Sequence, residues 1–234
     1  MNELRFGLTA AEPCAYLPEQ NEQVIFLLPE QPLHHSLYQQ LLQHNFRRSG
    51  DDVYRPHCSG CQQCQSVRLP VHTFTPSRRQ RRILAKANRQ GFRVQWQPAR
   101  SASDYFALYQ DYIDFKHQEG SMYPASIAQL ESLLTCNWMP VWTLELYDQQ
   151  QLVAVSVVDK LDNSLSAVYT FYHPKWQQFS PGLLAILLLI EQAKCLQSDF
   201  LYLGYYIADC EKMAYKGEFR PQQRFIDGKW HSIR

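Results

Sequence analysis

The order of apolar segments in the second half of the chain constrains its fold more than any other feature of the sequence. Stretches with helical spacing of apolar residues are followed by stretches rich in β-branched and aromatic residues, with short polar connectors. The predicted elements are helices at 104–118 and 126–135, strands at 139–147, 152–159 and 165–172, a helix from Pro181 to about Cys195, and a strand at 200–203. This order indicates an α+β or α/β domain with a mixed central sheet.

The longest apolar run, residues 183–190, lies inside the last predicted helix. It has eight residues, whereas a helix that spans a membrane needs about 20. We therefore expect a buried helix and no membrane partner. The N-terminus has no basic lead followed by an apolar stretch, so no secretory signal is evident and a cytoplasmic location is expected.

The order of elements resembles that of acetyltransferase-like (GNAT) folds, and this resemblance concerns the fold alone. Acyl-coenzyme A users of that fold hold the pyrophosphate on a glycine-rich turn before a helix, where backbone N–H groups meet the anion. The corresponding stretch here, residues 173–182, contains one glycine and two prolines. Coenzyme A is therefore not expected as a partner. We expect instead an acyl donor that is carried on RNA.

A basic block lies in the first half of a chain whose net charge is only +1. Residues 47–93 carry eleven basic side chains and two acidic ones, and none of the acids lies between Ser77 and Arg93. A solvated helix face would have acidic i,i+4 partners, so the block favours a polyanion, although charge alone does not separate RNA from DNA or an acidic protein. The candidate contacts all lie on a helix predicted at 78–89 and are Arg78, Arg79, Arg81, Arg82 and Lys86.

The two halves of the chain differ enough to predict two domains. The first half is rich in Pro, Cys and Arg, and its clearest periodic stretch is a helix at 36–46 with Ser36 as the N-cap. Residues 97–103 are rich in Pro, Ser and Ala and read as a linker. We therefore expect a Cys- and Arg-rich N-terminal domain at 1–98 and a GNAT-like domain at 99–234.

The chain has seven cysteines and no evident export signal, which favours free thiols or a metal site over disulfides. Cys58, Cys61 and Cys64 are spaced as ligands of zinc or an iron–sulfur cluster, and Cys14 is a possible fourth ligand. Free thiols in a redox-sensitive loop are the alternative.

A set of motifs spread over nearly the whole chain resembles the aminoacyl-tRNA-protein transferases, most closely the bacterial aspartate/glutamate leucyltransferases. They are FRRSG at 46–50, YRPHCSGC at 54–61, RRQRR at 78–82, YTFYHP at 169–174, YLGYYI at 202–207, CEKMAYK at 210–216 and FRP at 219–221. The resemblance implies transfer of leucine from leucyl-tRNA to the α-amine of proteins with N-terminal Asp or Glu, which marks them for degradation by the N-degron pathway. Arginyl transfer, the activity of the longer eukaryotic relatives, is the nearest rival.

The resemblance also implies roles for residues in these motifs. It makes the basic helix the tRNA contact, and in the wider family some members bind a metal or cluster at cysteines corresponding to Cys14 and to the Cys58/Cys61 region. It favours Lys216 as catalytic, together with Tyr215 and Tyr205, which could instead be core residues. The candidate substrate-binding residues are Arg47, Arg48, Ser49, Tyr169, Tyr172, Lys212 and Arg220.

The chemistry of the reaction narrows these roles. An aminoacyl ester is already activated, so no cofactor is required, and the enzyme must align a neutral amine, stabilise the oxyanion and let a proton leave. Glu145 and Asp209 are the carboxylates best placed in sequence to accept that proton. A pocket for N-terminal Asp or Glu needs a cation, which Arg47 and Arg48, or Lys212, Lys216 and Arg220, could supply. A non-catalytic RNA-binding protein is the hypothesis from another class.

Overall fold

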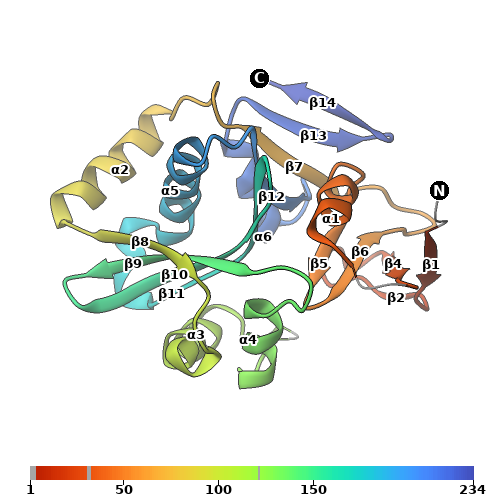
Figure 1. Cartoon of the computed structure of the whole chain (residues 1–234), viewed down its shortest axis with the longest axis horizontal. Helices are drawn as coiled ribbons and strands as arrows, with labels where there is room; N and C mark the ends of the chain where they lie inside the picture. The colour runs from red at the N-terminus through yellow and green to blue at the C-terminus, as the bar shows by residue number, and fades with distance from the viewer. Residues whose placement is uncertain (1–3, 31–32, 121) are drawn as a thin grey trace.

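A computed structural model describes residues 4–30, 33–120 and 122–234. Its centre is an eight-stranded mixed sheet with the strand order β14-β13-β7-β12-β11-β10-β9-β8 (Figure 1). All neighbouring strands pair antiparallel except β11 and β12, which are parallel. The strands are β7 (Gln65–Pro70), β8 (Arg93–Pro98), β9 (Val141–Asp148), β10 (Gln151–Lys160), β11 (Ser164–Tyr172), β12 (Phe200–Tyr206), β13 (Gln222–Ile226) and β14 (Lys229–Ile233).

Helices cover both faces of this sheet (Figure 1). On one face, α3 (Ala102–Lys116) and α4 (Ile127–Leu134) bury Tyr105, Tyr109 and Leu130 against the meander. On the other, α5 (Pro181–Cys195) buries Leu189 and Ile190, and α2 (Arg78–Gln90) packs beside it. The apolar run predicted as a buried helix is α5, and no helix within the described residues is long and apolar enough to cross a membrane.

A second, four-stranded sheet lies at the N-terminal side, with the order β1-β4-β6-β5. It consists of β1 (Arg5–Leu8), β4 (Val24–Leu28), β5 (Arg47–Ser49) and β6 (Asp52–Pro56), while β2 (Glu12–Pro13) and β3 (Asn21–Glu22) form a separate short pair. Helix α1 (His35–Leu42) buries Tyr38 and Leu42 in a core that also contains Met139 and Tyr202 from the second half. This part of the molecule therefore shares a core with the rest of the chain.

The sequence predicts the elements of the second half well and those of the first half poorly. The two helices, the meander and the Pro181 helix all form, within three residues of the predicted bounds. Helix α2 also forms, with a capping box at Ser77 and Gln80 and a left-handed Gly91 (φ 79°) after its end. The predicted N-cap of the first helix was wrong, because the His34 side chain, not that of Ser36, caps α1.

Strands from both sides of residue 98 lie in the central sheet. β7 pairs with β12 and with β13, and β8 pairs with β9. The stretch read as a linker therefore begins in β8 and ends in α3, which starts at Ala102. The resulting architecture is a mixed α+β fold with one central mixed sheet.

Candidate functional site

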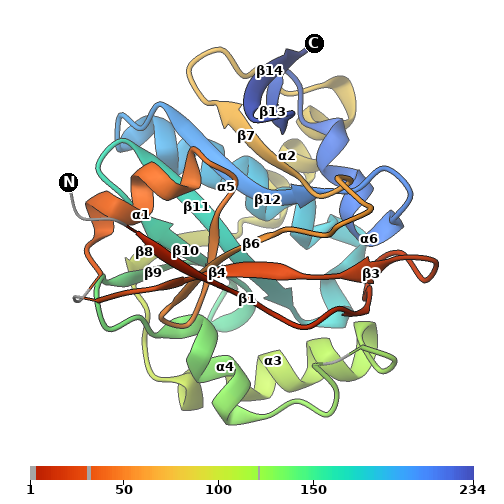
Figure 2. The ribbon, with the colours of Figure 1, turned by 90° about the vertical axis from the view of Figure 1, so that its right-hand side faces the viewer.

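The parallel strands β11 and β12 separate partway along their length. They pair only at Ser164–Ser166 with Phe200–Tyr202, although β11 continues to Tyr172 and β12 to Tyr206. Where they part, Gly204 has a left-handed backbone (φ 79°) and the register of β12 on β7 shifts, so β12 turns away from β11 (Figure 2). We call the gap beyond Ser166 and Tyr202 the strand wedge; Tyr169 lies on one side of it and Tyr205 on the other.

Lys216 lies beside the strand wedge, on the segment that follows β12. This segment is a short helix, α6 (Glu211–Ala214), continued by a 3-10 turn, η2 (Tyr215–Glu218). The Lys216 side chain is buried, and its Nζ donates to the Tyr205 carbonyl at 2.6 Å and lies 3.2 Å from Met213 Sδ. Burial and, to a smaller extent, the Arg47 guanidinium together lower the pKa of Lys216 to about 7. Near pH 7, Lys216 can therefore both hold and release a proton.

Arg47 supplies a second buried cation at this place. Its guanidinium lies over the rings of Tyr202 and Tyr205, at 5.3 and 5.6 Å, and Nη1 donates to the Phe46 carbonyl. Nε and Nη2 are buried and have no hydrogen-bond partner among the described residues. A buried charge without a counter-ion is costly, so the protein holds here a site that an anionic ligand would stabilise.

Arg48, the neighbour of Arg47, has a different environment. Its guanidinium lies 2.6 Å from Asp159 Oδ1 with both side chains fully buried, and Tyr38 donates to the same carboxylate at 2.9 Å. Further contacts go to the carbonyls of Gly50, Thr135 and Leu133. The ion pair joins β5 to β10, and the substrate-binding role expected for Arg48 stays a prediction.

This pair gives a stability prediction. Asp159→Asn leaves the Arg48 charge buried without a counter-ion, which should lower the free energy of unfolding by about 3–5 kcal/mol. Chemical denaturation of the variant measures this loss. Asp162→Asn, which removes an exposed carboxylate paired only with His35, is the control and should change stability by less than about 1 kcal/mol. Equal stability of the two variants would contradict the structural role.

Tyrosines of β11 face tyrosines of α3. The Tyr172 ring lies 4.9 Å from that of Tyr112, and the Tyr169 ring lies 6.2 Å from Tyr112 and 6.5 Å from Tyr109. The hydroxyls of Tyr109 and Tyr169 are buried without a hydrogen-bond partner in the described part of the chain. The sequence pattern predicts Tyr109 and Tyr112 only as core residues of a helix. It did not reveal that they contact tyrosines of the YTFYHP motif.

The other candidates lie around this centre. Tyr205 is buried and donates to the Asn45 carbonyl at 2.9 Å, while Tyr215 is 37% exposed with its ring 5.5 Å from Lys216 Nζ. Ser49, Lys212 and Arg220 are exposed. Lys212 and Lys216 do not share one helix face, because α6 ends at Ala214; Lys212 is exposed and Lys216 is buried.

Glu145 is not free to accept a proton. Its carboxylate accepts hydrogen bonds from Tyr105, Gln97, Thr143, Tyr147 and Arg100. Burial opposes ionisation, but these hydrogen bonds outweigh it and lower the pKa of Glu145. The residue therefore joins α3, β8 and β9 in the fold.

The basic helix α2 presents most of its charge to solvent. Arg78, Arg79, Arg81 and Arg82 are exposed, and Lys86 is half-buried. Arg79 pairs with Glu218 of η2 at 2.5 Å, which joins α2 to the segment that carries Lys216. Lys86 Nζ donates to the Gln178 carbonyl at 2.7 Å.

Cys14, Cys58, Cys61 and Cys64 are all half-buried. Burial and, to a smaller extent, the nearby thiols of the other three together raise the pKa of Cys64 to about 12. Within the described residues, however, no three or more His, Cys, Asp or Glu side chains are arranged as metal ligands. The cysteines thus gather near one another but do not form a fitting coordination site in this arrangement.

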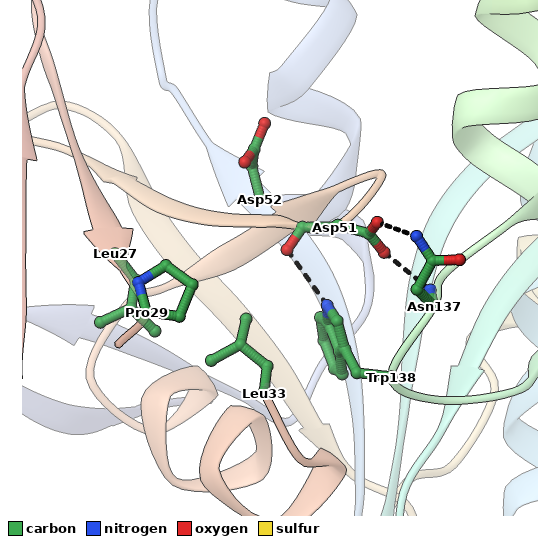
Figure 3. Close-up of a pocket in the computed structure, with 7 residues that line it drawn as sticks. All are labelled: Leu27, Pro29, Leu33, Asp51, Asp52, Asn137 and Trp138. Atoms are coloured by element: carbon green, nitrogen blue, oxygen red, sulfur yellow. Dashed lines mark hydrogen bonds between the residues drawn. The ribbon is translucent and has the colours of Figure 1, made fainter. Parts of the chain in front are cut away.

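One cavity lies apart from Lys216, at the N-terminal sheet (Figure 3). Its volume is about 260 Å³, and Leu27, Leu33 and Trp138 line it. Asp51 at its wall is held by hydrogen bonds from Asn137 and, at its carbonyl, from Trp138. The described residues that line it include two acids, Asp51 and Asp52, but no Ser, Cys, His, Lys or Arg.

Comparison with known proteins places the site in a family context. The family models "Arginine-tRNA-protein transferase, N terminus" and "Arginine-tRNA-protein transferase, C terminus" match residues 12–82 and 104–226. Proteins named aspartate/glutamate leucyltransferase are similar over nearly the full length. That of Pseudoalteromonas atlantica is 42% identical, covering 98% of each chain. That of Teredinibacter turnerae is 43% identical, covering 99% of this chain and 95% of the relative.

Solved structures show a similar fold. A conserved protein of unknown function from Bacteroides thetaiotaomicron has a TM-score of 0.51 and 10% identity, covering 89% of this chain and 79% of that one. L-PGS from Bacillus licheniformis has a TM-score of 0.50 and 15% identity, covering 63% of this chain and 48% of that one. At these identities the likeness concerns the fold alone.

Proposed function

The chain belongs to the aspartate/glutamate leucyltransferase family, and from this premise we propose that it transfers leucine from leucyl-tRNA to the α-amine of proteins that begin with Asp or Glu, marking them for N-degron degradation. The single observation that carries the proposal is Arg47, whose buried guanidinium lies next to Lys216 and the strand wedge and has two nitrogens without a hydrogen-bond partner among the described residues. An acidic side chain is the ligand that such a cation selects.

In this mechanism the strand wedge receives the aminoacyl end of the tRNA. The acceptor α-amine attacks the ester carbonyl carbon, a C–N bond forms, and the ester C–O bond breaks with release of the terminal ribose hydroxyl. Neutral Lys216 takes the proton that leaves the amine and passes it to the ribose oxygen. Its hydrogen bond to the Tyr205 carbonyl fixes Nζ for this exchange.

Arg47 selects the acceptor by pairing with the carboxylate of the N-terminal Asp or Glu. Its stacking on Tyr202 and Tyr205 fixes the guanidinium, so the pairing needs little reorganisation. An uncharged N-terminal side chain would leave the guanidinium buried and unpaired, which is the cost that gives strong discrimination. Arg48, Lys212 and Arg220 remain candidates for a supporting role, as do Ser49 and Tyr215.

The aromatic cluster beside the strand wedge favours leucine over arginine as the transferred residue. Tyr109, Tyr112, Tyr169 and Tyr172 pack against one another in this cluster, and within the described residues none of them forms a hydrogen bond with a carboxylate. An arginine side chain would need an acidic partner there. Arginyl transfer stays the rival, and non-catalytic RNA binding is the alternative from another class.

We propose that the reaction uses neither coenzyme A nor a required cofactor. The ester donor is already activated, and the 173–182 stretch forms a 3-10 turn, η1 (Pro174–Phe179), and the start of α5, where two prolines lack an N–H for a pyrophosphate. A zinc ion or iron–sulfur cluster on the four cysteines stays a prediction that no step above uses. The same holds for a cytoplasmic location and for the division into a recognition region, 1–98, and a transfer region, 99–234.

The basic face of α2 is the proposed tRNA contact. Reversal of Arg81 and Arg82 to Glu should weaken tRNA binding and make the dependence of log Kd on log salt less steep by about 2, because about two phosphate contacts are lost. Filter binding over a salt series measures both quantities. Arg5→Glu is the control, since Arg5 lies on β1, far from α2 (Figure 1). An unchanged salt slope in the double variant would remove α2 from the tRNA footprint.

The proposed function is tested by supplying radiolabelled leucyl-tRNA or arginyl-tRNA with peptides that begin with Asp, Glu or Ala. Leucine on the Asp and Glu peptides alone is the expected result. Arginine on the same peptides would establish the rival activity. Transfer of neither, with tRNA still bound, would favour the non-catalytic protein.

A further inference from the structure

A second cleft opens next to the reaction site, on the side of the cysteine loop. Its volume is about 300 Å³, and it lies between residues 17–20, residues 60–63 and Asp209. The first wall is a tight loop, closed by backbone hydrogen bonds from Gln20 to Leu17 and from Cys14 to Gln20. The third wall, Asp209, lies in the turn between β12 and α6.

The cleft is acidic and rich in amide groups. Glu19 and Asp209 carry its only charges, and both are exposed. Neither carboxylate takes part in an ion pair or side-chain hydrogen bond within the described residues. Glu145, in contrast, accepts hydrogen bonds from several side chains. The side chains of Gln62 and Gln63 are exposed beside them. Such a lining favours extended peptide with a positive charge and disfavours nucleic acid, whose phosphates the carboxylates would repel.

The cleft lies at the same end of β7 and β12 as Lys216, because Gln65 pairs with Tyr206 there and the Tyr205 carbonyl accepts a hydrogen bond from Lys216 Nζ. Asp209 directly precedes Cys210, and the Cys210 backbone N–H bonds back to the Ile207 carbonyl at the end of β12. Cys61 belongs to the same loop as Cys64. Both Cys210 and Cys64 lie close enough to Lys216 to affect its pKa. Gln63 and Asp209 of the cleft thus lie within three residues of the paired ends Gln65 and Tyr206, next to the strand whose carbonyl holds Lys216.

Resting on the proposed leucyl transfer, we propose that this cleft binds the residues that follow the N-terminal Asp or Glu of the acceptor, and that it selects Lys or Arg over Asp or Glu there. The recognised N-terminus is then acidic at its first residue, through Arg47, and basic just after it, through Glu19 and Asp209. Two exposed ion pairs of this kind correspond to a preference of about tenfold in kcat/KM.

The test compares three acceptor peptides that begin with Asp and continue with two Lys, two Gln or two Glu residues. We expect kcat/KM to be highest for the Lys peptide, intermediate for the Gln peptide and lowest for the Glu peptide. The differences should lie in KM and should become smaller when salt is added. In Glu19→Gln/Asp209→Asn the ratio between the Lys and Glu peptides should fall toward one. Glu19→Lys/Asp209→Asn should invert it. Because the ratio is taken within each variant, a general loss of activity does not affect it.

Glu131→Gln is the matched control, since Glu131 is an exposed acid on α4, away from the cleft, and should leave the ratio unchanged. Equal use of the three peptides by the native protein, or an unaltered ratio in the double variants, would overturn the cleft assignment while leucyl transfer stands. Failure to transfer leucine to any Asp peptide would instead overturn the proposed function.

Discussion

Lys216→Met should lower kcat for leucine transfer by about 100-fold or more, the usual contribution of a positioned proton acceptor. Methionine keeps the length of the aliphatic chain, so the buried space beside Met213 and Tyr205 stays filled. Single-turnover transfer of radiolabelled leucine to an Asp peptide measures the loss. Lys229→Met is the control, because Lys229 is an exposed lysine at the start of β14 and should change kcat little. Equal activity of the two variants would sink the assignment.

The pH dependence of leucine transfer tests the role of the Lys216 amine directly. Lys216 accepts a proton only as the neutral amine, and its pKa of about 7 lies far below the usual 10.5. Transfer should therefore rise with pH up to about 7 and level off above it, and the residual activity of Lys216→Met should lack this rise. A rise that persists in the variant would assign the titration to another group.

Arg47→Gln should lower kcat/KM for an Asp peptide by about 100-fold, while a matched Asn peptide should be used poorly by both proteins. The reason is that the variant loses the only buried guanidinium in the described chain that has unpaired nitrogens beside Lys216. Arg55→Gln is the control, since Arg55 lies on the adjacent strand with its guanidinium over Phe46. Retained discrimination between Asp and Asn in Arg47→Gln would contradict the pocket.

The same variant has a second readout that a purely structural role would not produce. The Arg47 charge lowers the pKa of Lys216, so its removal should move the pH–rate profile toward higher pH. Arg47→Lys keeps a positive charge but cannot bind a carboxylate in the bidentate way, so it should restore the pH profile better than the Asp preference. An unchanged pH–rate profile in Arg47→Gln would contradict the electrostatic coupling between Arg47 and Lys216.

Much of the fold could be predicted because the second half obeys local rules. Pro181 begins a helix, the apolar run to Ile190 is buried, and short connectors give the meander. The N-terminal sheet could not be found in this way, because β1, β4 and β6 pair across long stretches of sequence and their residues are only partly buried. Nothing local in Gln65–Pro70 shows that this strand enters the central sheet beside β12.

The site shows the same division between local and tertiary information. The FRRSG motif marks two arginines, but only the fold shows that Arg48 pairs with Asp159 of β10, whereas Arg47 forms no ion pair within the described residues. The change of helix type after Ala214 decides that Lys216 turns inward and Lys212 outward. The spacing of the cysteines is visible in sequence, whereas their mutual geometry is not.

The central claim is that leucine passes from tRNA to the α-amine of an acidic N-terminus. The most direct measurement is N-terminal sequencing of the product formed from radiolabelled leucyl-tRNA and an Asp peptide. Labelled leucine in the first cycle, followed by Asp in the second, is the predicted result. A first cycle that yields unmodified Asp, with no labelled leucine, would contradict it.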